Sequence, residues 1–190
     1  SELTTRVTEG TTTIYVTVEV SSSILLLPEV PMTGRLDNPR VGYFTNPLTN
    51  FSDGQQRVNK KQFITRWRLE PRPEDRAAYL RGEQVEPRKP IVFYIENSTP
   101  YRWRKYIKQG IEDWQVAFER AGFKNAIIAK DITEDMEVDM DDVNYSVLTY
   151  AASTKANAMG PSILDPRSGE ILEADIMWWH NVCLLYTSDA

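Results

Sequence analysis

The chain has 190 residues, of which 41% are hydrophobic and 11% aromatic, and its 22 basic and 27 acidic side chains give a formal net charge of -5. This composition is that of a folded globular protein and excludes a disordered one, while the acidic balance gives no support for nucleic-acid binding. No apolar run approaches the roughly 20 residues that cross a bilayer, so no transmembrane segment is expected.

The first 70 residues are predicted to form a β-rich N-terminal module. Alternating and β-branched side chains are typical of strands, and turn residues such as Ser52-Asp53-Gly54 separate them. The predicted strands are Thr11 to Val20, Ile24 to Leu27, Val41 to Thr45 and Gln62 to Leu69. In the last strand Arg66 and Arg68 share one face. The pair could grip an anionic ligand, but a solvated sheet face is the more ordinary interpretation of so small a basic cluster.

Residues 71–90 are predicted to be a proline-rich connector. Prolines frame one short helical segment, Glu74 to Arg81, which Gly82 ends. This stretch is the predicted boundary between the N-terminal module and the rest of the chain.

In residues 91–182 the spacing of apolar residues changes, and it predicts a strand, a long helix and two further strands. Ile91 to Ile95 is a compact apolar strand. A helix over residues 100–121 is predicted from Thr99 as N-cap, Pro100 at the first helical position and Gly122 as C-cap. Its apolar residues share one face: Ile107, Ile111, Trp114, Phe118 and Ala121. The remaining strands are Asn125 to Lys130 and Tyr145 to Ala151. This order predicts an α+β fold, a mixed α/β arrangement in which one long helix backs a twisted, mostly parallel sheet.

A strand, a tight turn and a second strand are predicted between Asn157 and Trp178. The turn is Asp165-Pro166-Arg167-Ser168-Gly169, whose residue types suit a tight turn, and many such hairpins bind nothing. Gly160-Pro161 limits the pairing of the first strand because proline lacks an N–H donor.

The segment Asp131 to Asp142 is rich in carboxylates. Its acidic residues are Asp131, Glu134, Asp135, Glu137, Asp139, Asp141 and Asp142. Oxygen ligands suit calcium, but the segment has neither the central Gly nor the closing Glu of a calcium-hand loop. A solvated acidic loop is therefore the default interpretation, with calcium unsupported.

One Cys and one His limit the metal and catalytic chemistry. Cys183 alone forms neither an internal disulfide nor a cysteine metal site, and zinc normally needs several His, Cys or carboxylate ligands. A Ser-His-Asp relay would have to use His180 as its base, but a His beside two Trp is more often a packed structural residue. We therefore expect no metal ligand and no catalytic residue in this chain.

Several longer strings carry a resemblance to a known family. They are residues 40–45 (RVGYFT), 65–71 (TRWRLEP), 90–95 (PIVFYI), 110–114 (GIEDW), 121–127 (AGFKNAI) and 165–173 (DPRSGEILE), with Trp178 and His180-Asn181 at the end. Through them the chain resembles large secreted bacterial zinc-dependent metalloproteases of the metzincin type, which carry DUF5117-like and DUF4953-like regions. In that family the next helix holds zinc through H-E-x-x-H and a third His, and the Glu acts as general base.

The resemblance implies that this chain supplies one wall of a substrate cleft and that a longer protein supplies the metal site. Residues 91–182 would be an incomplete zincin-like upper subdomain, and zinc, the cofactor, would be bound downstream, so that this chain alone would be inactive. An edge strand would hold an extended peptide or protein substrate. It consists of Ala156, Asn157, Ala158, Met159 and Gly160, with Ile171 to Trp178 as its hairpin partner. The resemblance also implies an extracytoplasmic location: periplasmic, outer-membrane-associated or secreted.

Two further expectations concern the C-terminal residues and an alternative function. Residues 183–190 depart from the family and resemble a translated sequencing adapter, so we expect them to be foreign to the natural protein. The alternative function is a non-catalytic β-rich binding module of a bacterial surface protein, in which the long helix is only a support.

Overall fold

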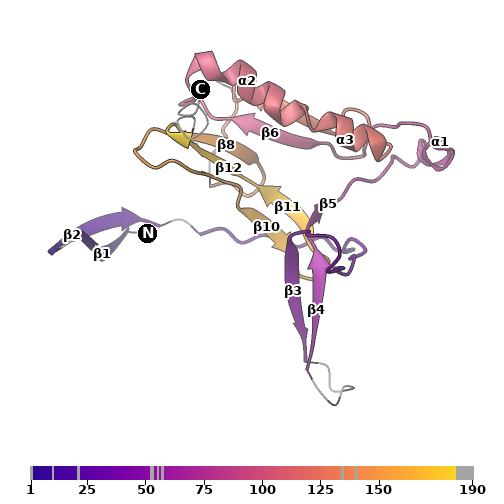
Figure 1. Cartoon of the computed structure of the whole chain (residues 1–190), viewed down its shortest axis with the longest axis horizontal. Helices are drawn as coiled ribbons and strands as arrows, with labels where there is room; N and C mark the ends of the chain where they lie inside the picture. The colour runs from indigo at the N-terminus through magenta and orange to yellow at the C-terminus, as the bar shows by residue number, and fades with distance from the viewer. Residues whose placement is uncertain are drawn as a thin grey trace.

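The computed structural model describes residues 2–9, 11–20, 22–51, 54, 56, 58–133, 135–139 and 141–182. The predicted foreign tail, residues 183–190, lies outside the described residues. The structure has a mixed α+β architecture, as the sequence predicts (Figure 1).

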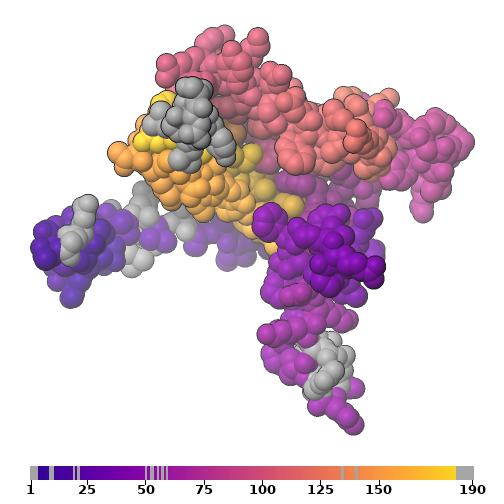
Figure 2. Space-filling view, in the orientation of Figure 1, coloured from indigo at the N-terminus to yellow at the C-terminus, as the bar shows by residue number. Residues whose placement is uncertain are grey.

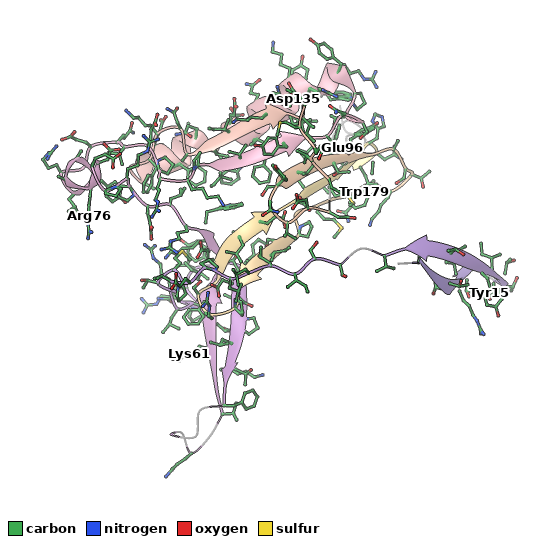
Figure 3. The ribbon with its side chains drawn as sticks, turned by 180° about the vertical axis from the view of Figure 1, so that it is seen from behind. Tyr15, Lys61, Arg76, Glu96, Asp135 and Trp179 are labelled. Carbon is green, nitrogen blue, oxygen red and sulfur yellow. The ribbon has the colours of Figure 1, made fainter. Side chains whose placement is uncertain are left out.

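The N-terminal part consists of two separate antiparallel hairpins. β1 (Glu2–Glu9) pairs with β2 (Thr12–Glu19), and β3 (Thr45–Asn50) pairs with β4 (Asn59–Ile64). In the described part of the chain, neither hairpin joins another sheet. The space-filling view shows both of them projecting from the body of the molecule (Figure 2), and in the view from behind Tyr15 and Lys61 label them (Figure 3).

Three strand predictions in this part need correction. Ile24 to Leu27 forms no strand, because this extended linker has no partner strand to complete a ladder, and Ile24 is fully exposed. Val41 to Thr45 follows a turn at residues 39–40, which the Val41 N–H closes by donating to the Asn38 carbonyl at 2.8 Å, and the strand begins only at Thr45. Gln62 to Leu69 is divided at Thr65, where the chain leaves β4 and enters the short β5 (Arg66–Trp67).

The main sheet has five strands in the order β7-β6-β8-β12-β9. These are β6 (Ile91–Ile95), β7 (Ile127–Asp131), β8 (Ser146–Ala151), β9 (Ala158–Met159) and β12 (Ile176–Trp179). The first three pairings are parallel, and only β9 runs antiparallel to its neighbour. The predicted mostly parallel sheet is thus confirmed.

The predicted long helix is two helices in succession. α2 (Tyr101–Glu112) and α3 (Gln115–Arg120) are separated by a turn at residues 113–114. Thr99 is not the N-cap, which is Pro100; the Thr99 N–H donates to the Glu96 carbonyl and its side chain is buried. Gly122 does end α3 with a φ of 92°, and the Phe123 N–H returns to the Phe118 carbonyl at 2.9 Å in the Schellman pattern. The short α1 (Arg76–Leu80) lies within its predicted segment.

The core lies between α2 and one face of the sheet. Ile91, Phe93 and Ile95 are buried, whereas the alternate residues of β6 are half-buried, as the two-residue period of a strand requires. Ile91 and Phe93 form a buried cluster with Ile111 of α2, Ala129 of β7 and Leu148 of β8. Burial of each such side chain contributes about 1.5–3 kcal/mol, so this layer is the main source of stability.

The predicted strand–turn–strand is a long ribbon that bends between two sheets. Near the turn, β10 (Ser162–Asp165) and β11 (Glu170–Ala174) pair antiparallel, and β11 runs parallel to β5. Beyond the bend, β9 and β12 belong to the main sheet. The predicted partner of the first strand, Ile171 to Trp178, is therefore divided between β11 and β12. Gly169 has a φ of 75° at the turn, and a Cβ there would stand 2.5 Å from the Ile64 carbonyl oxygen.

Candidate peptide-binding edge and apolar groove

The segment predicted to hold substrate lies at an edge of the main sheet. Ala158 and Met159 form β9, the last strand in the sheet order, while Ala156, Asn157 and Gly160 flank it outside the ladder. All five residues are exposed. The loop before β9 is anchored, since the Asn181 amide donates to the Thr154 carbonyl at 3.1 Å. The structure therefore presents a short, fixed edge strand.

The backbone of Ala158 points away from the sheet. The Trp179 N–H donates to the Asn157 carbonyl at 3.2 Å, and Ala158 lies opposite Trp178. Because bonded and non-bonded pairs alternate in an antiparallel ladder, the N–H and C=O of Ala158 face outward. The Asn157 side-chain oxygen accepts this N–H at 2.8 Å, so a peptide that pairs here has to displace it.

The opposite edge of the sheet is closed by helix side chains. The Gln115 side-chain oxygen accepts the N–H groups of Ala126 and Ile127 at 2.9 and 3.3 Å, and a Glu112 oxygen accepts the Ala129 N–H at 3.2 Å. These bonds satisfy the outward N–H groups of Ile127 and Ala129 in β7, which protects this part of the edge from further strands. The two edges therefore differ: the β7 edge is capped by side chains of α2 and the α3 start, whereas among the described residues the outward N–H of β9 is covered by one short amide side chain.

An apolar groove lies beside the β9 edge, on the face of the sheet that α2 covers. Its volume is about 460 Å³. It is lined by Trp67, Phe93, Ile107, Gly110, Ile111, Trp114, Phe118, Ile127, Leu148, Ala158, Ile176 and Trp178. Trp114 is 65% exposed, and a Cβ added at Gly110 would meet no atom within 4 Å. A glycine inside a helix costs about 1 kcal/mol, and here it leaves room over the helix surface.

An aromatic cluster stands at the end of the sheet next to this groove. The Trp178 ring lies 6.2 Å from Trp103 of α2 and 5.3 Å from Tyr150 of β8, and the Tyr150 ring lies 6.0 Å from that of His180. The His180 Nδ1 is buried and bonds to no group in the described part of the chain. The structure thus joins His180 to a packed aromatic cluster and gives its ring no relay partner among these residues.

Arg66 of β5 and Arg68, which follows it, hold a chain segment. Arg66 donates to the Thr33 carbonyl at 2.8 Å and Arg68 to the Val30 carbonyl at 3.0 Å. Arg167 from the turn adds a bond of 2.7 Å to the Pro28 carbonyl. Residues 28–33 are therefore fastened by three guanidinium groups, which we call the arginine clamp. Burial, followed by repulsion from Arg35, lowers the pKa of Arg66.

Residues of the turn between β10 and β11 hold Arg167 in position for the arginine clamp. Asp165 is fully buried, and its carboxylate accepts bonds of 3.0 and 2.7 Å from the Arg167 guanidinium and 2.9 Å from the Arg167 N–H. These bonds lower the pKa of Asp165 against the opposing effect of burial. The Ser168 hydroxyl oxygen accepts the Glu170 N–H at 3.2 Å. The polar side chains of the DPRSG string, residues 165–169, thus bond to each other and to other parts of the chain.

The acidic segment is not one continuous ligand set. Asp131 pairs with Lys108 and Arg104 of α2, and Asp142 accepts bonds from Asn144. Glu134 lies outside the described residues. Within the described part of the chain, no three His, Cys, Asp or Glu side chains are grouped to hold a metal ion as they stand. Among the same residues, no helix is long and apolar enough to cross a membrane.

Sequence reasoning missed two features of the site region. The capping of β7 by Glu112 and Gln115 could have been suspected from polar residues one helical turn apart beside an apolar face. The convergence of Glu173 and Asp175 with the acidic segment at the bend of the ribbon has no local sequence signal, because it depends on tertiary packing.

Comparison with known proteins yields one family. Residues 1–72 match the model described as Domain of unknown function (DUF5117). This confirms the DUF5117 part of the resemblance over the two hairpins, β5 and the start of the connector. No curated protein and no solved structure matches the chain.

Proposed function

We propose that the chain is part of a zinc-dependent metalloendopeptidase of the metzincin type, in which residues 91–182 form the upper wall of the substrate cleft. An extended peptide pairs with the free edge of β9. The observation that carries the proposal is that Ala158, whose backbone groups face outward at this edge, also lines the apolar groove. A peptide paired with β9 and a structural element packed in the groove therefore lie next to each other.

The contrast between the two sheet edges supports this assignment. An enzyme that binds many peptide sequences needs backbone hydrogen bonds, because these do not depend on side chains. The β7 edge is capped by Glu112 and Gln115, while in the described part of the chain the side chain that a peptide has to displace at β9 is the Asn157 amide. Peptide addition is therefore directed to β9.

The groove supports a second helix supplied by a longer form of the chain. Its lining is mostly apolar, Trp114 is largely exposed, and Gly110 permits close approach of another backbone. With a single His, this chain does not fit a zinc site, so the metal ligands belong to that helix. When bound there, zinc supplies a nucleophile by lowering the pKa of its water. The residues present here hold and orient the peptide. An extracytoplasmic location belongs to the same proposal.

The first test is the longer protein. Its gene should encode H-E-x-x-H within a few tens of residues after Val182, and the purified product should contain one zinc and cleave casein. The chain of 190 residues should do neither. A complete downstream frame without the motif would refute the proposal, as would zinc-dependent cleavage by the 190-residue chain.

The same longer protein allows a sharper test of the edge. Ala158→Pro removes an outward N–H that takes no part in the β9–β12 ladder, so the sheet should persist while peptide binding weakens. We expect kcat/KM to fall about tenfold, the value of one backbone hydrogen bond, with zinc content unchanged. Ala158→Val keeps the donor and is the matched control. Equal kcat/KM for the two variants would remove β9 from the substrate site.

The alternative, a non-catalytic binding module of a bacterial surface protein, rests on the N-terminal hairpins. They project from the body (Figure 1). Tyr15 of β2 is exposed on one hairpin, and Phe44 and Phe51, which flank β3, are exposed on the other. Binding of a partner by residues 1–72 in a longer protein that lacks H-E-x-x-H would favour this function.

A further inference from the structure

We propose that residues 22–27, the tether between β2 and the arginine clamp, are a proteolytic cleavage site for an endopeptidase with a specificity pocket for large aliphatic side chains. Cleavage there separates the β1–β2 hairpin and leaves the rest of the chain folded. This proposal is independent of the metalloendopeptidase assignment.

The backbone of the tether is free and extended. The tether lies between the first hairpin and the body (Figure 1) and belongs to no helix or strand. The Ser23 hydroxyl donates to the Asp141 carbonyl at 3.5 Å, but the backbone groups of residues 22–27 form no hydrogen bond within the described part of the chain. Clefts that hold an extended peptide pair with such free groups. Cleavage of the tether therefore needs no local unfolding, which limits the cleavage rate elsewhere in a folded protein.

The side chains of the tether alternate between solvent and the body. Ile24 is 100% exposed and Leu26 is 93% exposed, while Leu25 and Leu27 are half-buried, as the two-residue period of an extended chain requires. A pocket that encloses an exposed aliphatic side chain gains binding free energy, because it removes apolar surface from water. The tether thus offers two large aliphatic side chains to an apolar specificity pocket.

Exposure alone does not define the site, and Phe44 provides the comparison. Its side chain is 89% exposed, but its C=O accepts the Thr65 N–H at 2.9 Å and the chain enters β3 at the next residue. A peptidase that binds the backbone at Phe44 has to break this pairing first. The tether is favoured because it combines exposed aliphatic side chains with free backbone groups.

The arginine clamp fixes the chain on the C-terminal side of the tether. It holds the carbonyls of Pro28, Val30 and Thr33, and the Met32 side chain is buried. Residues 28–33 are therefore protected from a peptidase. The chain end that cleavage creates stays fastened to the body.

The hairpin on the N-terminal side of the tether contributes nothing to the main core. In the described residues β1 and β2 pair only with each other, and neither buried cluster contains a residue from them. A two-stranded hairpin is at best marginally stable by itself. Its release should therefore remove no stabilising layer from the helix-backed sheet.

The test is limited proteolysis of the 190-residue chain with thermolysin, which cleaves before large apolar residues, followed by mass spectrometry. Hydrolysis adds water across the broken C–N bond, so the residue before the cut gains a carboxylate and the residue after it gains an amino group. We expect the first cuts before Ile24 and Leu26, at least about tenfold faster than any other cut, because other sites first have to open. The larger product should keep the melting temperature of the intact chain.

Two variants make the assignment specific. The double substitution Ile24→Asp and Leu26→Asp keeps the tether exposed but removes both aliphatic side chains from solvent, and it should slow cleavage of the tether at least about tenfold. Phe44→Asp removes a similarly exposed apolar side chain outside the tether and should leave that rate unchanged. First cleavage outside residues 22–27 would overturn the proposal. So would a larger product with a lowered melting temperature, an unchanged rate in the double variant, or an equal loss in Phe44→Asp.

Discussion

The N-terminal hairpins and the helix-backed sheet use similar strand-forming residues with opposite results. In β1–β2, Val7, Ile14 and Tyr15 are exposed by 46%, 52% and 67%, whereas in β6 Ile91 and Ile95 are exposed by 3% and 0%. The difference is the second layer: α2 covers β6, and in the described residues no element covers the first hairpin. Strand propensity is local, but burial needs a partner layer.

Paired isoleucines give the strongest test of this comparison. Ile95→Ala should lower the free energy of unfolding by about 3 kcal/mol, because it removes a fully buried side chain and leaves a cavity. Ile14→Ala makes the same chemical change on the exposed hairpin and should cost less than about 0.5 kcal/mol. Urea unfolding of both variants measures the difference. Equal losses would mean that the hairpin is packed against something in solution.

The arginine clamp joins the two regions, and its removal should have the next largest effect. Arg167→Ala leaves the buried Asp165 carboxylate without its guanidinium and frees the Pro28 carbonyl. We expect a loss of about 2 kcal/mol, below the full value for a buried pair because Arg167 is partly exposed.

A surface ion pair provides the control for the clamp. Arg81→Ala breaks the bond with Glu83, whose two side chains are both more than half exposed, and should cost less than about 0.5 kcal/mol. Limited proteolysis gives a second measurement, since cleavage within residues 22–33 should accelerate in Arg167→Ala alone. Unchanged cleavage in that variant would show that Arg66 and Arg68 hold the segment without Arg167.

Sequence patterns predicted elements whose signals are local. The apolar run Ile91 to Ile95 matches β6 from end to end, and Gly122 ends a helix because it takes a left-handed φ. Sequence patterns gave wrong predictions where the structure depends on tertiary contacts. Ile24 to Leu27 has strand composition without a partner strand, and Thr99 suits an N-cap but is buried below the helix start.

For the candidate site, the sequence predicted the position of the edge strand but not the direction of its backbone groups. The sequence places a short strand at residues 156–160, and Gly160-Pro161 indicates why it is short. It does not reveal that Asn157 covers the outward N–H of Ala158, because this depends on which side of the ladder each donor faces. The DPRSG string is predicted as a tight turn, but its residue types do not reveal that its charged residues bond to each other and to the linker.

The last prediction concerns Glu173 of β11, in the three-stranded sheet beside the helix-backed one, where burial of a carboxyl group opposes stability. Glu173 has a pKa raised to about 8 by burial and by Asp175, so the folded state binds its proton more tightly than the unfolded state does. The stabilisation that this proton provides is complete below about pH 4.5 and is lost as the pH rises toward 8. Stability should therefore fall by at most about 1.4 kcal/mol per pH unit across this window. Glu173→Gln cannot titrate and should flatten the fall, while Glu137→Gln should keep it. Urea midpoints at pH 5, 6.5 and 8 measure the slopes, and a slope in Glu173→Gln equal to that of the unmodified chain would assign the effect to another group.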